Sequence, residues 1–309
     1  MRFILFLRTL SMFAFLALLL AGVGALVSFM FIGNWYIGMA IMMVITVIMC
    51  FCSYYWSKEM ALRSSGARII TEVENPRLFS IVRDVAGRAG VPMPEVGISR
   101  EITPNAFATG RNPKNAAVVC TQGLLDLLPD DELRGVIAHE MSHIKNRDIL
   151  VMSLTTAIVS IVSYLARMMW WMAIFAPMGR RDSKESLIML GVAIAAQILV
   201  PIAAIMVQLG ISRNREYLAD ETGAMIIRDP RSLARALGHL EGMNLRMQAD
   251  PRIADRKDRH NPANDYDCAH MWIANPLKRG SLIERLFSTH PPMQDRIERL
   301  NRLADKMGL

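Results

Sequence analysis

The five residues His139-Glu140-Met141-Ser142-His143 place two histidines and a glutamate within little more than one helical turn. A spacing of four brings His139 and His143 onto the same face of a helix, where both imidazoles can reach one ion. Glu140 then points its carboxylate towards the water that such an ion would hold. The motif predicts a catalytic zinc centre with one zinc ion per chain, two histidine ligands, and Glu140 as the general base.

The residues before this motif predict the helix that carries it. Pro129 and the acidic run 130–132 suit a first helical turn, where backbone N–H groups are free and the dipole is positive. Apolar residues then recur at helical spacing, at Leu133, Val136 and Ile137, which predicts that the helix packs into a core. The alternative, two incidental histidines on a surface helix, is disfavoured by this placement.

A third ligand is expected, because catalytic zinc usually takes three protein groups and a water molecule. The stretch Glu216-Tyr217-Leu218-Ala219-Asp220 is similar to the gluzincin pattern, in which a glutamate ligand precedes an aspartate by four residues. We predict Glu216 as the third ligand. Asp220, on the same helix face, is predicted to accept a hydrogen bond from a ligand histidine, His139, and to fix its tautomer.

Two long apolar segments open the chain. The stretch from Thr9 to Ser57 contains no charged residue, which is enough for two spanning helices of about 20 residues each. We expect helices at 9–31 and 36–56, joined by a turn at Gly33-Asn34. A cleaved signal peptide is the alternative for the first segment, but the length of the apolar run and the second run behind it favour an uncleaved hairpin.

Two further apolar runs follow the histidine motif. The run 149–179 is interrupted only by Arg167, and the run 187–210 carries no charge, so both are long enough to span a bilayer. A hairpin that turns at about 178–186 would return Glu216 to the side of His143, which supports Glu216 as a ligand. Polar residues within these runs and basic residues in the turn leave open a shallow hairpin, or one that lines a polar cavity.

The distribution of basic residues predicts the orientation. Arg2, Arg8, Lys58, Arg63 and Arg68 flank the first two apolar segments on the side of the N-terminus and of the long hydrophilic stretch. The positive-inside rule therefore places both termini and the catalytic part in the cytoplasm. We expect an integral membrane protein of the bacterial inner membrane, with the lipid bilayer as a partner.

The net charge of +7 is explained by this bias rather than by nucleic-acid binding. The basic residues are scattered, and no nucleic-acid motif accompanies them, so nucleic acid is excluded as a partner. The four cysteines form no CxxC pair, and an oxidised scaffold is not indicated. Cys120, between Val119 and Thr121, is predicted to be a buried strand residue.

The hydrophilic segments predict a small α/β unit beside the motif helix. A helix within 75–89 precedes three short strands at 95–99, 105–109 and 116–121, and a short helical piece follows at 123–128. The expected fold is an α-helical membrane protein with four membrane helices and an α+β zincin-like catalytic domain. Its expected segments are an N-terminal hairpin (1–57), two catalytic halves (58–148 and 211–309), and a second hairpin between them (149–210).

The C-terminal part predicts two helices, at 231–247 and 293–306, on either side of a polar stretch at 250–267. His290 lies in an extended segment before the last helix, because Pro291 and Pro292 each restrain the residue before them. A rigid turn that only positions the helix is the alternative to a role in the site. Arg296 falls in the first turns of that helix.

Four motifs in this order resemble the HtpX-type membrane zinc endopeptidases, relatives of the CAAX prenyl endopeptidases within the gluzincins. They are Asn105-Ala106-Phe107-Ala108-Thr109-Gly110, the histidine motif, the 216–220 motif and Thr289-His290-Pro291-Pro292. The resemblance covers nearly the whole chain. It implies cleavage of misfolded or damaged membrane proteins and other unfolded polypeptides at the cytoplasmic face, as part of quality control under stress.

The resemblance also implies roles for residues outside the ligand set. His290 would stabilise the developing oxyanion with Arg296 as its partner, and Asn105, Ala106 and Phe107 would lie on an edge strand that pairs with an extended substrate. Two other functions stay open at this point: a non-catalytic membrane scaffold, and a metal-dependent hydrolase of a non-peptide bond. The substrates and the oligomeric state are not determined by the sequence.

Overall fold

The computed structural model describes residues 35–149, 184–249 and 291–309, together with single positions between 11 and 28 and between 151 and 167. The chain divides into two compact units, and each is made from two separate stretches. Met1–Tyr54 and Met152–Ile211 form the first unit, and Tyr55–Val151 and Ser212–Leu309 form the second. The expected helix at 9–31, most of the second hairpin up to its turn, and the polar stretch at 250–267 lie outside the continuously described residues.

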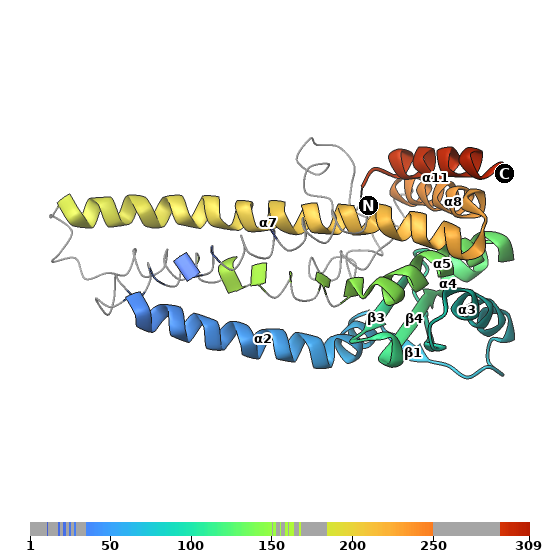
Figure 1. Cartoon of the computed structure of the whole chain (residues 1–309), viewed down its shortest axis with the longest axis horizontal. Coiled ribbons are helices and arrows are strands. Elements are labelled where there is room, and N and C mark those ends of the chain that lie inside the picture. The colour runs from blue at the N-terminus through green and yellow to red at the C-terminus, as the bar shows by residue number, and fades with distance from the viewer. Residues whose placement is uncertain are drawn as a thin grey trace. The chain divides into compact units, whose positions relative to one another are not determined.

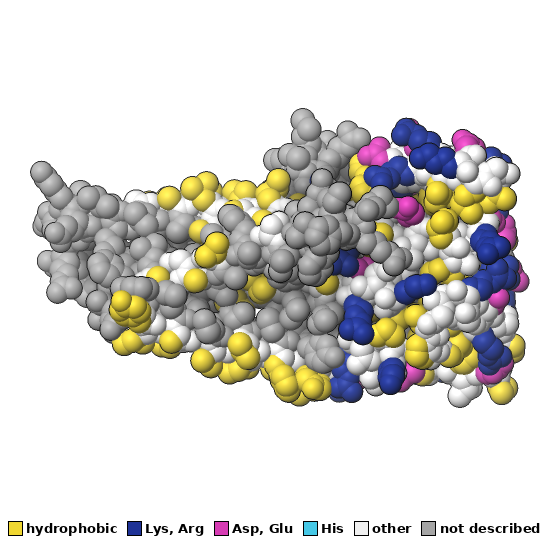
Figure 2. Space-filling model, viewed as in Figure 1, with side chains coloured by type: hydrophobic (Ala, Val, Ile, Leu, Met, Phe, Trp, Pro, Cys, Tyr) yellow, Lys and Arg dark blue, Asp and Glu magenta, His cyan; other side chains and the backbone are white. Residues whose placement is uncertain are grey.

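Helix α2 (Trp35–Ser64, Figure 1) contains the second predicted membrane segment and continues eight residues beyond the expected end at 56. No glycine or proline stands between Trp56 and Gly66, so nothing stops the helix until Gly66 adopts a φ of 58°. Its described apolar side chains are widely exposed, among them Ile41, Val47 and Phe51. Figure 2 shows hydrophobic side chains over the described part of this segment.

Helix α7 (Lys184–Ile227) is one continuous element of 44 residues, and it runs across the expected boundary between the second hairpin (149–210) and the second catalytic half (211–309). Pro201 lies inside the helix without ending it. Between Gly210 and Glu216 there is no proline and no turn sequence, so the helix propagates from the apolar segment into the motif.

Only part of the membrane prediction is supported. Within the described residues, the segment Gln197–Ile227 of α7 is the one helix long and apolar enough to cross a membrane by length and composition. The prediction of four membrane helices is therefore not confirmed. The predominantly helical architecture with a small sheet agrees with the expected fold class.

The second unit contains a four-stranded mixed sheet in the order β1-β2-β4-β3. Strand β2 (Glu95–Ser99) pairs in parallel with β4 (Ala116–Thr121), and the other pairings are antiparallel. Strand β3 (Ala106–Gly110) begins one residue later than expected and lies at one end of the sheet. Strand β1 (Ala67–Ile69) was not predicted, because three residues are too few to show an alternating pattern.

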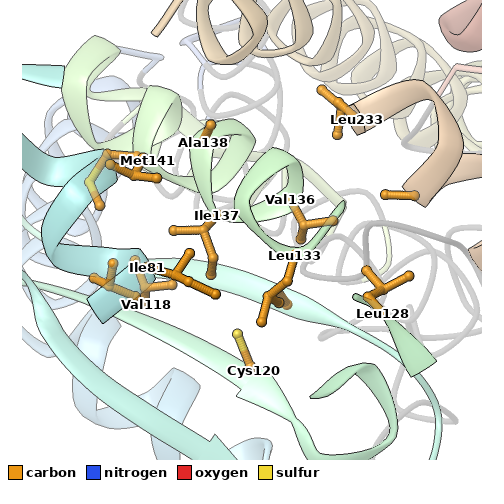
Figure 3. Close-up of a cluster of buried hydrophobic side chains, with 14 of the residues drawn as sticks. Ile81, Val118, Cys120, Leu128, Leu133, Val136, Ile137, Ala138, Met141 and Leu233 are labelled. Atoms are coloured by element: carbon orange, nitrogen blue, oxygen red, sulfur yellow. The ribbon is translucent and has the colours of Figure 1, made fainter. Parts of the chain in front are cut away.

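Three α-helices and a 3₁₀ turn surround the sheet: α3 (Pro76–Ala89), α4 (Gln122–Leu127), α5 (Asp130–Asn146) and η1 (Pro113–Asn115). Asn75 caps α3 by accepting a hydrogen bond from the Leu78 N–H at 2.9 Å. Figure 3 shows side chains of α5 lying over strand β4, with Val118 and Cys120 beneath them. Cys120 is fully buried in this core, as predicted.

Two helices complete the second unit. Helix α8 (Pro230–Ala249) packs against α5, and α11 (Met293–Met307) packs against α8 (Figure 1). The approach of α8 to α5 requires Gly135, because a Cβ there would lie 2.8 Å from the Leu233 backbone nitrogen. Burial of the apolar faces of these helices holds α5 between the sheet and α8.

Candidate metal centre and active site

The three predicted ligands meet where α5 and α7 cross. His139 Nε2 and His143 Nε2 lie 3.2 Å apart. The carboxylate of Glu216 approaches both rings, at 3.6 Å from His139 Nε2 and 3.5 Å from His143 Nε2. One ligand atom from each residue therefore lies within 4.8 Å of the others, a geometry that can hold a single metal ion.

Close contact between the two ligand helices depends on small groups. Ser142 Oγ donates to the carbonyl oxygens of His139 at 2.6 Å and of Ala219 at 3.1 Å, so its hydroxyl bridges α5 and α7. Gly223 lies against the backbone of α5, where an added Cβ would be 2.9 Å from the His139 nitrogen. The glycine lets α7 approach near enough for Glu216 to face the histidines.

Behind His139 lies the ion pair of Asp220 and Arg296. Asp220 Oδ1 is 3.0 Å from His139 Nδ1, the contact expected from the sequence, although the angle is not that of a hydrogen bond. Arg296 donates two hydrogen bonds to Asp220, from Nε at 2.8 Å and from Nη2 at 2.7 Å. Arg296 Nη1 also lies 3.3 Å from Glu216 Oε2, so one buried guanidinium contacts both carboxylates of the 216–220 motif.

Behind His143 lies a second ion pair, which the sequence analysis missed. Asp148 Oδ2 is 2.9 Å from His143 Nδ1, and Arg215 Nη1 donates a hydrogen bond to Asp148 Oδ1. Arg147 ends α5 with a left-handed conformation (φ 59°, ψ 34°), and this turn directs Asp148 back to the histidine. Helical periodicity gives no sign of this contact, because Asp148 lies beyond the end of α5.

The charges at this site fit a divalent cation. Four carboxylates are buried there: Glu140, Asp148, Glu216 and Asp220. Two guanidinium groups, of Arg215 and Arg296, face them. When both imidazoles are neutral, these described groups carry two more negative charges than positive ones. Burying charge without compensation costs free energy. A dication bound by two imidazoles and a carboxylate would balance the site, and this donor set suits zinc.

The same carboxylates change the proton affinity of the histidines. Burial alone would lower the pKa of His143, but its contacts with Asp148 and Glu216 outweigh burial and hold that pKa well above the usual range. The pKa of His139 is also raised, because Asp220 and Glu216 outweigh the effect of burial there. Protons therefore compete with a metal ion for both imidazoles.

Glu140 faces the edge of the sheet. The Ala108 N–H of strand β3 donates to Glu140 Oε2 at 2.7 Å, so this backbone group points away from β4 and into the site. Burial raises the pKa of Glu140, partly offset by the nearby imidazoles and by the Ala108 N–H. A carboxylate with a raised pKa is suited to take up a proton and release it again. The contribution of the Ala108 N–H was not predicted.

The predicted substrate residues lie on or next to this edge strand. Ala106 and Phe107 belong to β3, and Asn105 directly precedes it. All three side chains are buried, so the strand offers its backbone rather than these side chains. His290 lies outside the described residues, and its predicted role in the site stays a prediction.

Comparison with known proteins agrees with this geometry. Residues 72–304 match the model of peptidase family M48. The chain belongs to this family. The protease HtpX homolog of Thermococcus sibiricus is 46% identical over 99% of this chain and 98% of its own length. The corresponding protein of Thermococcus kodakarensis is 45% identical over 100% of this chain and 99% of its own length.

A solved structure shows a related fold. Ste24p of S. mikatae superposes with a TM-score of 0.54 at 18% sequence identity, and covers 85% of this chain and 58% of that chain. The family and its relatives confirm the predicted class: the chain is a metalloendopeptidase of the HtpX type. The group formed by His139, His143 and Glu216 could hold the metal ion of such an enzyme.

Proposed function

We propose that the chain is a zinc-dependent endopeptidase of the membrane that cleaves unfolded or damaged polypeptides, including membrane proteins, at the cytoplasmic face. The observation that carries the proposal is the convergence of His139, His143 and Glu216 directly beside Glu140 and an edge strand. The apolar part of α7 and the exposed apolar side chains of α2 support membrane association.

The ligand set would hold zinc through two imidazole nitrogens and one carboxylate. Zinc bound there supplies Lewis acidity, which polarises a peptide carbonyl and lowers the pKa of water towards neutrality. Asp220 and Asp148 each contact the Nδ1 side of one histidine, which leaves both Nε2 atoms turned towards the centre. Arg296 contacts both Glu216 and Asp220, and this guanidinium outweighs the effect of burial and lowers the pKa of Asp220.

Glu140 would carry the proton between the two halves of the reaction. As a carboxylate it takes a proton from the attacking water, and it then delivers that proton to the nitrogen of the leaving amine. The Ala108 N–H holds Oε2 of Glu140 by a hydrogen bond and so fixes the plane of the carboxylate. The raised pKa of Glu140 favours the protonated form that the second half needs.

Strand β3 would bind the substrate. Its inner edge pairs with β4, and its other edge carries the Ala108 N–H that faces Glu140. An extended polypeptide that paired with this edge would place its backbone beside the general base. Pairing through backbone groups tolerates many side chains, which agrees with action on unfolded chains of diverse sequence.

The test is proteolysis of an unfolded model protein by the full chain in detergent. Wild type is compared with Glu140→Gln, with and without a chelator, and zinc is then added back. Glu140→Gln removes the base at nearly constant shape, and we expect a loss of at least about 100-fold in turnover. Chelation should abolish wild-type activity, and zinc should restore it.

Three outcomes would count against the proposal. Equal activity of wild type and Glu140→Gln would assign the cleavage to a contaminant. Zinc bound at one ion per chain without proteolysis would favour the scaffold, and hydrolysis of esters alone would favour the hydrolase of a non-peptide bond.

A further inference from the structure

We infer that Asp148 and Arg215 form a positioning pair that orients His143 for the metal and fixes it to the helix that carries Glu216. This inference rests on the proposed metal site and goes beyond its three ligands. Its basis is the chain of contacts from His143 Nδ1 to Asp148, and from Asp148 to Arg215.

Asp148 fixes the orientation of the His143 imidazole. A carboxylate 2.9 Å from Nδ1 accepts a hydrogen bond from the N–H of that nitrogen, and the lone pair of Nε2 then faces Glu216 and His139. Without Asp148, either tautomer and more than one ring orientation become accessible. Asp148 is 1% exposed, so its contact with His143 is shielded from solvent.

The ion pair of Asp148 and Arg215 links the end of α5 to α7. Arg215 directly precedes Glu216 in α7, and its guanidinium contacts the Asp148 carboxylate. His143 and Glu216 are 73 positions apart in the sequence, yet this ion pair joins their neighbours directly. The pair therefore acts on the distance between a histidine ligand and the glutamate ligand, and not only on the fold of either helix.

The left-handed turn at Arg147 places Asp148 beside His143. Arg147 is exposed and adopts a left-handed conformation, with its N–H bonded to carbonyl oxygens of His143 and Ile144. Glycine enters this region freely, whereas a β-branched residue resists it. The backbone at this position can thus be varied without altering a side chain that touches the site.

The experiment measures zinc affinity of the full chain in detergent by competition with a chromophoric chelator. For Asp148→Ala we expect the dissociation constant for zinc to rise about 10- to 100-fold. Asp148→Asn retains an acceptor but loses the charge, so a smaller rise is expected. Arg147→Val should weaken zinc binding and Arg147→Gly should leave it near wild type, because only valine opposes the turn.

The matched control is Asp131→Asn. Asp131 also pairs with an arginine of another helix, Arg235 at 2.6 Å, but both side chains are about half exposed. Asp131 lies in the first turn of α5, two turns before His139. We expect zinc affinity to stay unchanged. Cobalt(II) in place of zinc gives a second readout, since its visible spectrum should change with Asp148→Ala and not with Asp131→Asn.

Two results would overturn the inference. If Asp148→Ala lowers only the unfolding temperature, with zinc affinity and the cobalt spectrum unchanged, Asp148 serves the fold alone. If Asp148→Ala does not fold, zinc affinity is measured in Asp148→Asn, Arg147→Val and Arg147→Gly. Wild-type zinc affinity in all three variants refutes the inference. A wild-type chain that binds no zinc would instead refute the proposed function.

Discussion

Each of the two histidines of the candidate metal site contacts an aspartate that is paired with an arginine, but the two arginines differ in how far they are exposed to solvent. His139 is backed by Asp220 and Arg296, and His143 by Asp148 and Arg215. The Arg296 side chain is fully buried and bonds its aspartate through two nitrogens, whereas the Arg215 side chain is 18% exposed. A His–Asp–Arg chain can thus be built either inside the core or at its margin.

The difference follows from where each arginine comes from. Arg296 belongs to α11, the last helix of the chain, and reaches the site from outside the two helices that carry the predicted ligands. Arg215 belongs to α7 itself and sits one residue before the ligand Glu216. The contacts of His139, Asp220 and Arg296 therefore join three helices, α5, α7 and α11. The contacts of His143, Asp148 and Arg215 join only α7 to the turn at the end of α5.

The largest expected effect is the loss of the buried guanidinium. Arg296→Gln leaves Asp220 and Glu216 buried without their cation, and we expect about 3–5 kcal/mol of destabilisation in the metal-free protein. Arg215→Gln should cost less, about 1–3 kcal/mol, because Asp148 keeps its contact with His143. Denaturant titration of both variants in detergent measures the difference. Equal losses of unfolding free energy would show that the two His–Asp–Arg contacts contribute equally to stability.

The next effect concerns the approach of α7 to His139. Gly223→Ala adds a Cβ at 2.9 Å from the backbone of α5, so the helices must separate. We expect about 1–3 kcal/mol of destabilisation and a weaker zinc affinity. Gly238→Ala is the control, because a Cβ there meets nothing within 4 Å among the described residues. Normal zinc affinity in Gly223→Ala would show that the site tolerates a shift of α7.

The smallest effect is a change in how stability depends on pH. Both histidines have a raised pKa in the metal-free fold, so they bind protons more tightly than in the unfolded chain. Their contribution is complete below about pH 6.5, the unfolded value, and is lost as the pH rises through the folded values. The metal-free protein should therefore become less stable above pH 6.5, while the zinc-bound protein, which needs neutral imidazoles, should not.

The two histidines should contribute unequally to this slope. The pKa of His143 lies well above the usual range, with Asp148 as the larger of the causes that raise it. Asp148→Asn should therefore flatten the pH dependence of the metal-free protein more than Asp220→Asn does. Unfolding midpoints at pH 6 and pH 8.5, with chelator present, test this order. The reverse order would indicate that His139 carries the proton.

The sequence was sufficient for the parts of the site that follow helical spacing. His139, His143, Glu216 and Asp220 lie four apart in pairs on α5 and α7, and the structure brings all four together. Arg296 was expected near the site as a partner of His290, because the family resemblance implied that role, whereas the structure pairs it with Asp220 and Glu216. The strands at 95–99 and 116–121 also stood out, because runs of apolar and β-branched residues are bounded there by turns.

The remaining parts depend on geometry that spacing does not encode. Asp148 reaches His143 only because Arg147 adopts a left-handed turn, and Arg215 was hidden among other basic residues of α7. The Ala108 N–H is a backbone group, so no residue type marks it. The sequence also does not show that α7 is continuous across residue 210, where apolar residues give way to charged ones without a helix-breaking residue.

The order of the elements along the chain has a consequence for biosynthesis. His139 and Glu140 leave the ribosome first, Glu216 follows 73 positions after His143, and Arg296 comes a further 80 positions later. At a synthesis rate of about 5–20 residues per second, roughly 8–30 seconds separate the general base from the arginine that closes the site. A nascent chain that carries the histidine motif therefore first lacks Glu216. After Glu216 has been made, the nascent chain still lacks the guanidinium of Arg296. The order of translation itself delays the assembly of a protease among unfinished polypeptides.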